Sequence, residues 1–293
     1  MRVLLAAPSS PTRLHNLVPL AWALRTAGHD VKIAGRNSFL DEILSTGCVA
    51  VDLGGDDDAE SAALVEFAKL WRPEVVVSDA QAPGTAAARA VEAVAVRLLG
   101  PLDEPETADA DTTFDTVPPS LRDAGTPVRP VRHVPYFGPT VVPNWLRRKA
   151  RRSRVLLSLA DATLFGPVFD AVAALDFELI CATDPGRVPA GVTMPANVRL
   201  VDSAPPAALL PTCAAVVHDG DAALALAAVT HGLPQLSLTE SAIAARIAAA
   251  GAGYVGEAGQ IPELTSLSGA ANALRDEIAA LPAPRALVAE LTR

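Results

Sequence analysis

The chain has 293 residues, of which 50% are hydrophobic and 19% are charged, and its formal net charge at pH 7 is −9. This composition excludes a disordered chain and supplies ample material for a packed core. The acidic balance argues against a nucleic-acid-binding face, since an acidic protein repels phosphate. The length exceeds what one hydrophobic core usually reaches, so we expect two domains.

The cysteines and the apolar runs indicate where the protein resides. Cys48, Cys181 and Cys213 are far apart and have neither a CxxC nor a metal-binding spacing. We expect them to be small buried residues in a reducing cytoplasm. The first apolar run is too short for a signal peptide, and no run approaches the roughly 20 residues of a membrane span. The sequence therefore predicts a cytoplasmic protein without membrane contact.

The first part of the chain alternates short apolar runs with segments of helical periodicity. The apolar runs that predict strands cover residues 2–7, 31–34, 49–53 and 74–78. The periodic segments that predict helices cover residues 17–26, 39–45, 59–70 and 84–93. Alternation of this kind builds a parallel sheet.

The middle of the chain lacks such periodicity. Residues 103–130 are acidic and then proline-rich, which predicts an irregular loop or linker. A basic cluster follows Trp145 and is interpreted as a solvated linker; it comprises Arg147, Arg148, Lys149, Arg151, Arg152 and Arg154. The second half then repeats the first pattern, with strands predicted at 155–159, 178–182, 198–201, 215–218 and 235–238 and helices at 168–175, 222–230, 243–249 and 270–281.

These elements predict an α/β protein of two Rossmann-like lobes, with the first lobe shortened. We place an amino-terminal acceptor-type lobe at residues 1–140, a basic linker at 141–154 and a carboxy-terminal donor-type lobe at 155–293. Two such lobes would place a ligand cleft between them, at the carboxyl ends of the strands.

Several motifs have a distinctive sequence. They read LVPLAWALR at 17–25, AGH at 27–29, WRP at 71–73, FGPTVVPNWL at 137–146, LLPTCAAVVH at 209–218, HGLPQ at 231–235 and GAG at 251–253. Together they resemble the two-lobed GT-B glycosyltransferases that attach nucleotide-activated deoxysugars to macrolides and related antibiotics. The resemblance covers most of the chain and implies the GT-B architecture. It does not by itself imply the activity, because function depends on the site and not on the fold.

The first departure from the family concerns its catalytic base. The resemblance implies a histidine after the first strand that takes the proton of the acceptor hydroxyl. Arg13 stands at that position, with His15 two residues further on. Arginine stays protonated at physiological pH and cannot accept a proton. His15 could replace the base only if the loop is rewound, and an ordinary loop histidine explains it equally well.

The second departure concerns the donor diphosphate. The family places HHGGxG followed by Ser or Thr where a strand meets a helix, so that helix N–H groups surround the diphosphate. Here residues 218–224 read HDGDAAL, which puts Asp219 and Asp221 at that position. Each carboxylate–phosphate pair at about 4 Å costs on the order of 4 kcal/mol at a dielectric constant of about 20. We therefore predict that donor binding is lost unless a cation intervenes. The alternative is that Asp221 only caps the helix.

The remaining candidates follow from the same alignment. Glu240 is a substitute for the family's acidic residue that holds sugar hydroxyls, and Asp161 adds a carboxylate after the strand at 155–159. The predicted catalytic residues are Arg13, His15, Asp79, Asp219 and Asp221, and the predicted substrate-binding residues are Ser9, His218, Glu240 and Ser241. We expect no metal and no cofactor; a nucleotide sugar or a divalent cation enters only under an alternative function.

Three functions are compatible with these residues. The leading prediction is a natural-product biosynthesis protein that has lost nucleotide-sugar transfer and binds a hydrophobic polyketide-like compound in the cleft. Its acid–base groups would then catalyse cyclisation, dehydration or isomerisation. The first alternative is an active deoxysugar transferase in which Asp219 and Asp221 hold a cation that bridges the diphosphate. The second is a non-catalytic partner of an active transferase. A homodimer is compatible with each of them, whereas nucleic acid and membranes are not expected partners.

Overall fold

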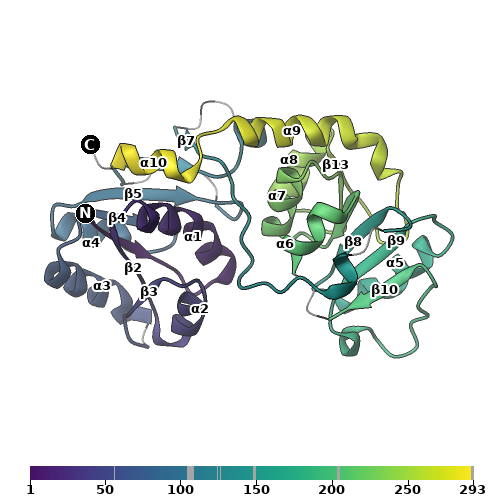
Figure 1. Cartoon of the computed structure of the whole chain (residues 1–293), viewed down its shortest axis with the longest axis horizontal. Coiled ribbons are helices and arrows are strands. Elements are labelled where there is room, and N and C mark those ends of the chain that lie inside the picture. The colour runs from purple at the N-terminus through teal and green to yellow at the C-terminus, as the bar shows by residue number, and fades with distance from the viewer. Residues whose placement is uncertain are drawn as a thin grey trace. The chain divides into compact units, whose positions relative to one another are not determined.

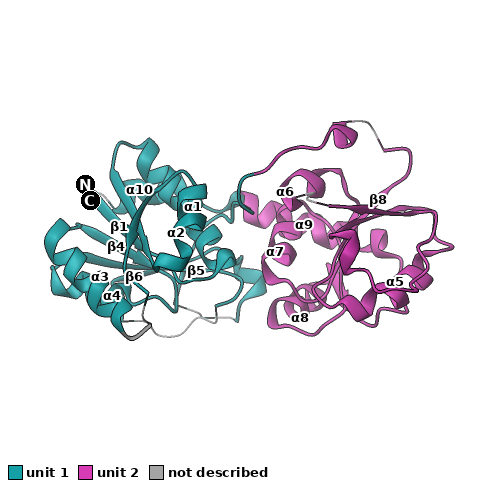
Figure 2. Ribbon diagram, turned by 90° about the horizontal axis from the view of Figure 1, so that it is seen from below, with its two compact units in different colours: residues 1–139, 280–293 teal, residues 140–279 magenta. Residues whose placement is uncertain are grey.

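A computed structural model describes residues 1–55, 57–103, 109–123, 125, 127–147, 150–202 and 205–291. Figure 1 shows the course of the chain and labels its elements. The chain forms two compact units, which Figure 2 shows in different colours. Unit 1 consists of Met1–Pro139 and Ala280–Arg293, and unit 2 consists of Thr140–Ala279.

Unit 1 is built on a parallel sheet with helices packed against it. The described strands pair in the order β3-β2-β1-β4-β5-β6-β7, all parallel. The strands are β1 (Arg2–Ala6), β2 (Asp30–Gly35), β3 (Val49–Asp52), β4 (Val75–Ser78), β5 (Val94–Leu99), β6 (Thr112–Asp115) and β7 (Arg129–Pro130). The helices are α1 (Pro11–Thr26), α2 (Leu40–Ser45), α3 (Asp57–Trp71), α4 (Gly84–Ala90) and α10 (Pro284–Leu291).

Helix α1 positions two of the predicted site residues, so its limits matter. We predicted that it begins at residue 17, but it begins at Pro11. Proline suits the first turn of a helix because its fixed φ fits and its missing N–H has no intrahelical partner there. The helix ends before Gly28, whose φ of +87° is a conformation that glycine adopts without steric cost. Its apolar face is fully buried in the core of unit 1.

Unit 2 has the same architecture. Its described strands pair in the order β10-β9-β8-β11-β12-β13, all parallel. The strands are β8 (Arg154–Ser158), β9 (Glu178–Ala182), β10 (Val198–Val201), β11 (Ala215–His218), β12 (Gln235–Ser237) and β13 (Gly253–Val255). The helices are α5 (Phe165–Val172), α6 (Pro206–Leu209), α7 (Ala222–Thr230), α8 (Ala242–Ala249) and α9 (Ser268–Ala280).

The α/β prediction with two Rossmann-like units is confirmed, but parts of the element prediction are wrong. Residues 103–130, predicted to be an irregular loop, contain β6 and β7. Strands β5 and β13 and helices α6 and α10 were also not predicted. Of the segment predicted to be a loop, residues 104–108, 124 and 126 lie outside the described residues.

The compact units also divide the chain differently from the predicted lobes. Helix α10 belongs to unit 1, where Leu287 and Val288 pack in the same core as Leu14 and Leu17 of α1. The second unit begins at Thr140, so the linker predicted at 141–154 belongs to unit 2. The apolar face of α10, at the end of the chain, is therefore buried against residues from the start of the chain.

The cysteines are free thiols, with Cys48 and Cys181 buried and Cys213 half-buried. Burial raises the pKa of Cys181 to about 12 and that of Cys213 to about 11. Both side chains are therefore protonated at neutral pH. Among the helices that the structure describes, we find none with the length and apolar character needed to cross a membrane.

Candidate active site

The predicted site residues form one group in each unit. Ser9, Arg13, His15 and Asp79 belong to unit 1, and His218, Asp219, Asp221, Glu240 and Ser241 belong to unit 2. In each unit they lie on segments that follow the carboxyl ends of parallel strands. This edge is where open α/β sheets bind their ligands.

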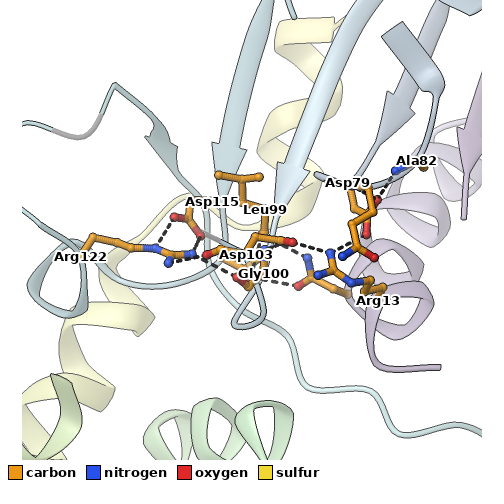
Figure 3. Close-up of polar contacts among 11 residues, drawn as sticks. Arg13, Asp79, Ala82, Leu99, Gly100, Asp103, Asp115 and Arg122 are labelled. Carbon is orange, nitrogen blue, oxygen red and sulfur yellow. Dashed lines mark hydrogen bonds and ion pairs between the residues drawn. The ribbon is translucent and has the colours of Figure 1, made fainter. Parts of the chain in front are cut away.

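The Arg13 guanidinium is held by two buried carboxylates in unit 1 (Figure 3). Its Nη1 donates to Asp79 Oδ2 at 2.8 Å and also to Asp103 Oδ1. Asp79 Oδ1 in turn accepts the backbone N–H groups of Gln81 and Ala82 at 2.9 and 2.8 Å. Burial opposes the charge of Arg13, but the hydrogen bonds to both carboxylates outweigh burial and raise its pKa. Arg13 therefore stays charged and does not act as a base.

A second arginine extends this network across the sheet edge (Figure 3). Arg122 donates from Nε to Asp115 Oδ2 at 2.7 Å and from Nη2 to Asp115 Oδ1 at 3.1 Å. It also donates to the backbone oxygens of Asp103 at 2.7 Å and Gly100 at 3.0 Å. Burial raises the pKa of both Asp103 and Asp115. The side chains of Arg122 and Asp115 are only 4% and 0% exposed, so each depends on the other for its charge.

The space beside Arg13 is small. The cavity that Arg13, Asn16, Asp79 and Asp103 line has a volume of about 10 Å³, which is room for about one water molecule. Asn16 uses its amide nitrogen to bind the backbone oxygen of Leu99 at 3.1 Å. The contacts therefore hold α1 against the ends of β4 and β5, with Arg13 and Asp79 in the network. The catalytic roles expected from the sequence, stabilisation of an enolate or carboxylate by Arg13 and acid–base chemistry by Asp79, stay predictions.

His15 has the chemistry that Arg13 lacks. Its Nε2 lies 3.1 Å from Glu42 Oε1 of α2, and its ring packs edge-on against Tyr136 with centroids 5.0 Å apart. Burial lowers the pKa of His15, although Glu42 acts in the opposite direction. The ring is therefore neutral at pH 7, and when Nε2–H donates to Glu42, Nδ1 accepts a proton. Ser9 is exposed between β1 and α1.

In unit 2, His218 at the end of β11 is buried and fully hydrogen-bonded. Its Nδ1 accepts the N–H of Gly220 at 3.1 Å, so Nε2 carries the proton and donates to Gln235 Oε1 at 3.2 Å. The amide nitrogen of Gln235 continues to the backbone oxygen of Ala225 at 2.9 Å. Burial lowers the pKa of His218, which keeps it neutral. Both ring nitrogens of His218 thus form hydrogen bonds inside unit 2. Neither is left for the contact with substrate that the sequence predicted.

Asp219 joins two strand ends. Its Oδ2 accepts the backbone N–H groups of Ala160 at 2.6 Å and Asp161 at 2.8 Å, which follow β8. Asp161 itself accepts the N–H of Thr163 at 2.9 Å and its hydroxyl at 2.7 Å. The hydroxyl and the backbone N–H of Thr163 lower the pKa of Asp161. Both aspartates therefore accept hydrogen bonds from the loop after β8, and the lowered pKa of Asp161 keeps that side chain ionised.

Asp221 caps helix α7. Its Oδ1 accepts the N–H groups of Ala223 and Leu224, each at 3.0 Å. These are the free N–H groups that a phosphate at a helix N-terminus would use. The predicted capping role of Asp221 is therefore present in the structure, and it places a carboxylate on the donors that a diphosphate needs.

The remaining predicted residues lie close by in sequence. Ser241 caps α8 by accepting the N–H of Ala244 at 3.3 Å, and Glu240 is exposed just before it. In the parts of the chain that the structure describes, no group of three or more His, Cys, Asp and Glu side chains is arranged to hold a metal ion.

Four residues of unit 1 were not predicted from the sequence: Glu42, Asp103, Asp115 and Arg122. Asp103, Asp115 and Arg122 all lie in the segment 103–130, which we predicted to be a loop. Asp115 is the last residue of strand β6 in that segment. The apolar run VAVRLL could have predicted strand β5 from the sequence. A strand there would place Asp103 near the same sheet edge as Asp79.

Two family models match parts of the chain. The model described as "Erythromycin biosynthesis protein CIII-like, N-terminal domain" matches residues 100–160. The corresponding C-terminal domain matches residues 167–293.

Individual proteins are similar over the whole chain. Tylactone mycaminosyltransferase of Streptomyces fradiae is 30% identical over 416 residues, which covers 100% of this chain and 92% of the relative. The 10-deoxymethynolide desosaminyltransferase of Streptomyces venezuelae is 29% identical over 412 residues, with 100% and 97% covered. Since this chain has 293 residues, both relatives contain segments that it lacks.

Solved structures agree with the sequence comparison. The glycosyltransferase VinC in complex with dTDP has a TM-score of 0.88 and 30% identity, covering 100% of this chain and 99% of VinC. SnogD of Streptomyces nogalater, also a glycosyltransferase, has a TM-score of 0.88 and 27% identity, with 100% and 98% covered. The predicted GT-B fold is confirmed, and the chain belongs to the erythromycin biosynthesis protein CIII-like family of antibiotic glycosyltransferases.

Proposed function

We propose that the chain transfers a deoxysugar from a nucleoside diphosphate to a hydroxyl group of a hydrophobic, polyketide-like acceptor in antibiotic biosynthesis. The observation that supports this most strongly is the 30% identity to tylactone mycaminosyltransferase across the whole chain. The likeness to VinC bound to dTDP supports a thymidine nucleotide as the donor. The active transferase, our first alternative from the sequence, is therefore the first candidate.

In this proposal the donor phosphates bind at the start of α7 in unit 2. The N-terminus of a helix carries a partial positive charge and free N–H groups, which favour an anion. Asp221 now occupies the N–H groups of Ala223 and Leu224, so its carboxylate must swing away as the diphosphate enters. Asp221 is exposed, which leaves its side chain room to move.

The proposed base is His15, supported by Glu42. As the acceptor oxygen attacks the anomeric carbon, Nδ1 of His15 takes the hydroxyl proton and the nucleoside diphosphate leaves with the bonding electrons. Glu42 stabilises the resulting imidazolium through Nε2, at the 3.1 Å distance that the structure shows. Arg13 does not compete for this role, because both of its carboxylate partners keep it charged.

A second candidate is the repurposed protein that the sequence predicted first. One observation favours it: the carboxylates of Asp219 and Asp221 occupy four backbone N–H groups at the strand ends of unit 2. In that case the chain binds its hydrophobic compound without a nucleotide, and the acid–base groups of unit 1 act on that compound. A non-catalytic partner protein shares the same expectation of no nucleotide binding.

Calorimetric titration with dTDP separates these candidates. A transferase is expected to bind dTDP with a dissociation constant on the order of 1 mM or tighter. Mg²⁺ is expected to strengthen binding because it offsets the charge of the diphosphate. Thymidine is the control, since it has the same base and sugar but no phosphate. The absence of dTDP binding with and without Mg²⁺ would reject the transferase in favour of the second candidate.

A further inference from the structure

Unit 2 has a large cavity away from the strand ends just described. It lies at the amino ends of β8, β9 and β10 and has a volume of about 630 Å³; its walls include Trp145, Arg151, Arg152, Arg154, Glu178 and Arg199. Asp219 and Asp221 follow the carboxyl end of β11, which runs parallel to these strands. The cavity is therefore at the opposite edge of the sheet from the donor-type site. Its volume is in the range of small-molecule sites, about 300–1,000 Å³.

The walls of this cavity carry an excess of positive charge. Glu178 pairs with Arg154 at 3.1 Å and lies 3.9 Å from Arg199. Arg152 lies 3.3 Å from Asp176, whose side chain is 90% exposed. None of the described residues forms an ion pair with Arg151. The cavity walls thus hold four guanidinium groups and one carboxylate, with Asp176 beside Arg152 outside the walls, on a chain whose net charge is −9.

Trp145 organises two of these guanidinium groups. The guanidinium of Arg199 lies 4.1 Å from the centroid of the indole ring, and that of Arg154 lies 5.4 Å from it. Cation–π contact restrains both side chains, and the N–H groups that do not face Glu178 can bind a further partner. The interpretation as a solvated linker is wrong for Arg154, which is buried, and Arg148 and Lys149 lie outside the described residues.

We propose that this cavity binds a small polyanion, specifically a diphosphate group, either free or within a nucleotide. Two uncompensated positive charges in one cavity call for a ligand with at least two negative charges. A guanidinium group binds two phosphate oxygens through two parallel N–H groups. A diphosphate therefore offers enough oxygens, close together, for several arginine side chains. The site is independent of sugar transfer, since it shares no described residue with the start of α7.

Inorganic pyrophosphate is the probe, with the indole N–H resonance of Trp145 as the local readout. A W145F variant assigns that resonance. We expect pyrophosphate to shift it and the R151Q/R199Q variant to weaken binding by about tenfold or more, because charge-assisted hydrogen bonds are lost. The R285Q variant removes one positive charge from an exposed arginine of unit 1, as R151Q does at the cavity, and is expected to bind as the wild type does.

Two further arms identify the ligand. If dTDP shifts the Trp145 resonance at lower concentration than pyrophosphate does, the ligand is a nucleotide. The single variant R151Q breaks no described ion pair, so it tests the site even if the double variant is unstable, and its affinity is expected to fall in the same direction. Equal affinity of R151Q and wild type, pyrophosphate binding without a shift at Trp145, or tighter binding of citrate would overturn the proposal.

Discussion

Replacing Arg122 by methionine is expected to lower the free energy of unfolding by about 3–5 kcal/mol. The variant removes the guanidinium that binds both oxygens of Asp115 and leaves that carboxylate buried without a counter-charge. It also removes the donors to the backbone oxygens of Gly100 and Asp103. Chemical denaturation, followed by a probe in unit 1, measures the change.

Two further variants show whether the buried charge is the cause. R89M breaks the ion pair of Arg89 with Asp111, whose side chains are 48% and 41% exposed, and is expected to cost less than about 1 kcal/mol. D115N/R122M removes both charges and is expected to be more stable than R122M alone. Equal losses in R122M and R89M would show that the network of unit 1 contributes no more than an exposed ion pair.

The second large effect is a gain in dTDP affinity on the order of 100-fold in the variant D219N/D221S. Asparagine keeps an oxygen for the N–H groups of Ala160 and Asp161, and serine keeps a cap for α7. Only the two negative charges are lost. We expect about tenfold per charge, well below the unscreened Coulomb energy, because Asp221 is exposed and Asp219 is half-exposed.

Calorimetry of the variant and the wild type with dTDP measures this gain. D276N is the matched control, since it removes one exposed carboxylate from α9, away from the strand ends. The gain of D219N/D221S is expected to shrink as ionic strength rises, because salt screens exposed charges. A gain no larger than that of D276N would mean that repulsion at the start of α7 does not limit donor binding.

The elements that the sequence predicted best are those with apolar runs between clear turn signals. Strands β9, β10 and β11 have the predicted limits; β9 and β11 have buried apolar centres, and β10 has a buried valine at each end. Strand β6 was missed because only Phe114 and Asp115 of its four residues are buried. Its place in the sheet depends on pairing with β5, which no local pattern encodes.

The site was harder to predict because its contacts join distant parts of the chain. Arg13 and Asp103 are 90 residues apart, and Asp219 and Ala160 are 59 residues apart. The sequence showed that Arg13 and Asp219 depart from the family pattern, but it did not show which groups form hydrogen bonds with them. Asp221 differs, since its partners lie within three residues, and its capping role was accessible from the sequence alone.

In the proposed transferase, a nucleoside diphosphate binds at the start of α7 by displacing the Asp221 carboxylate. The backbone amide resonances of Ala223 and Leu224 report on this directly, because Asp221 is their present partner. Adding dTDP is expected to shift both amide resonances, whereas thymidine at the same concentration leaves them in place. Saturation with dTDP that leaves both amides unchanged would contradict the claim.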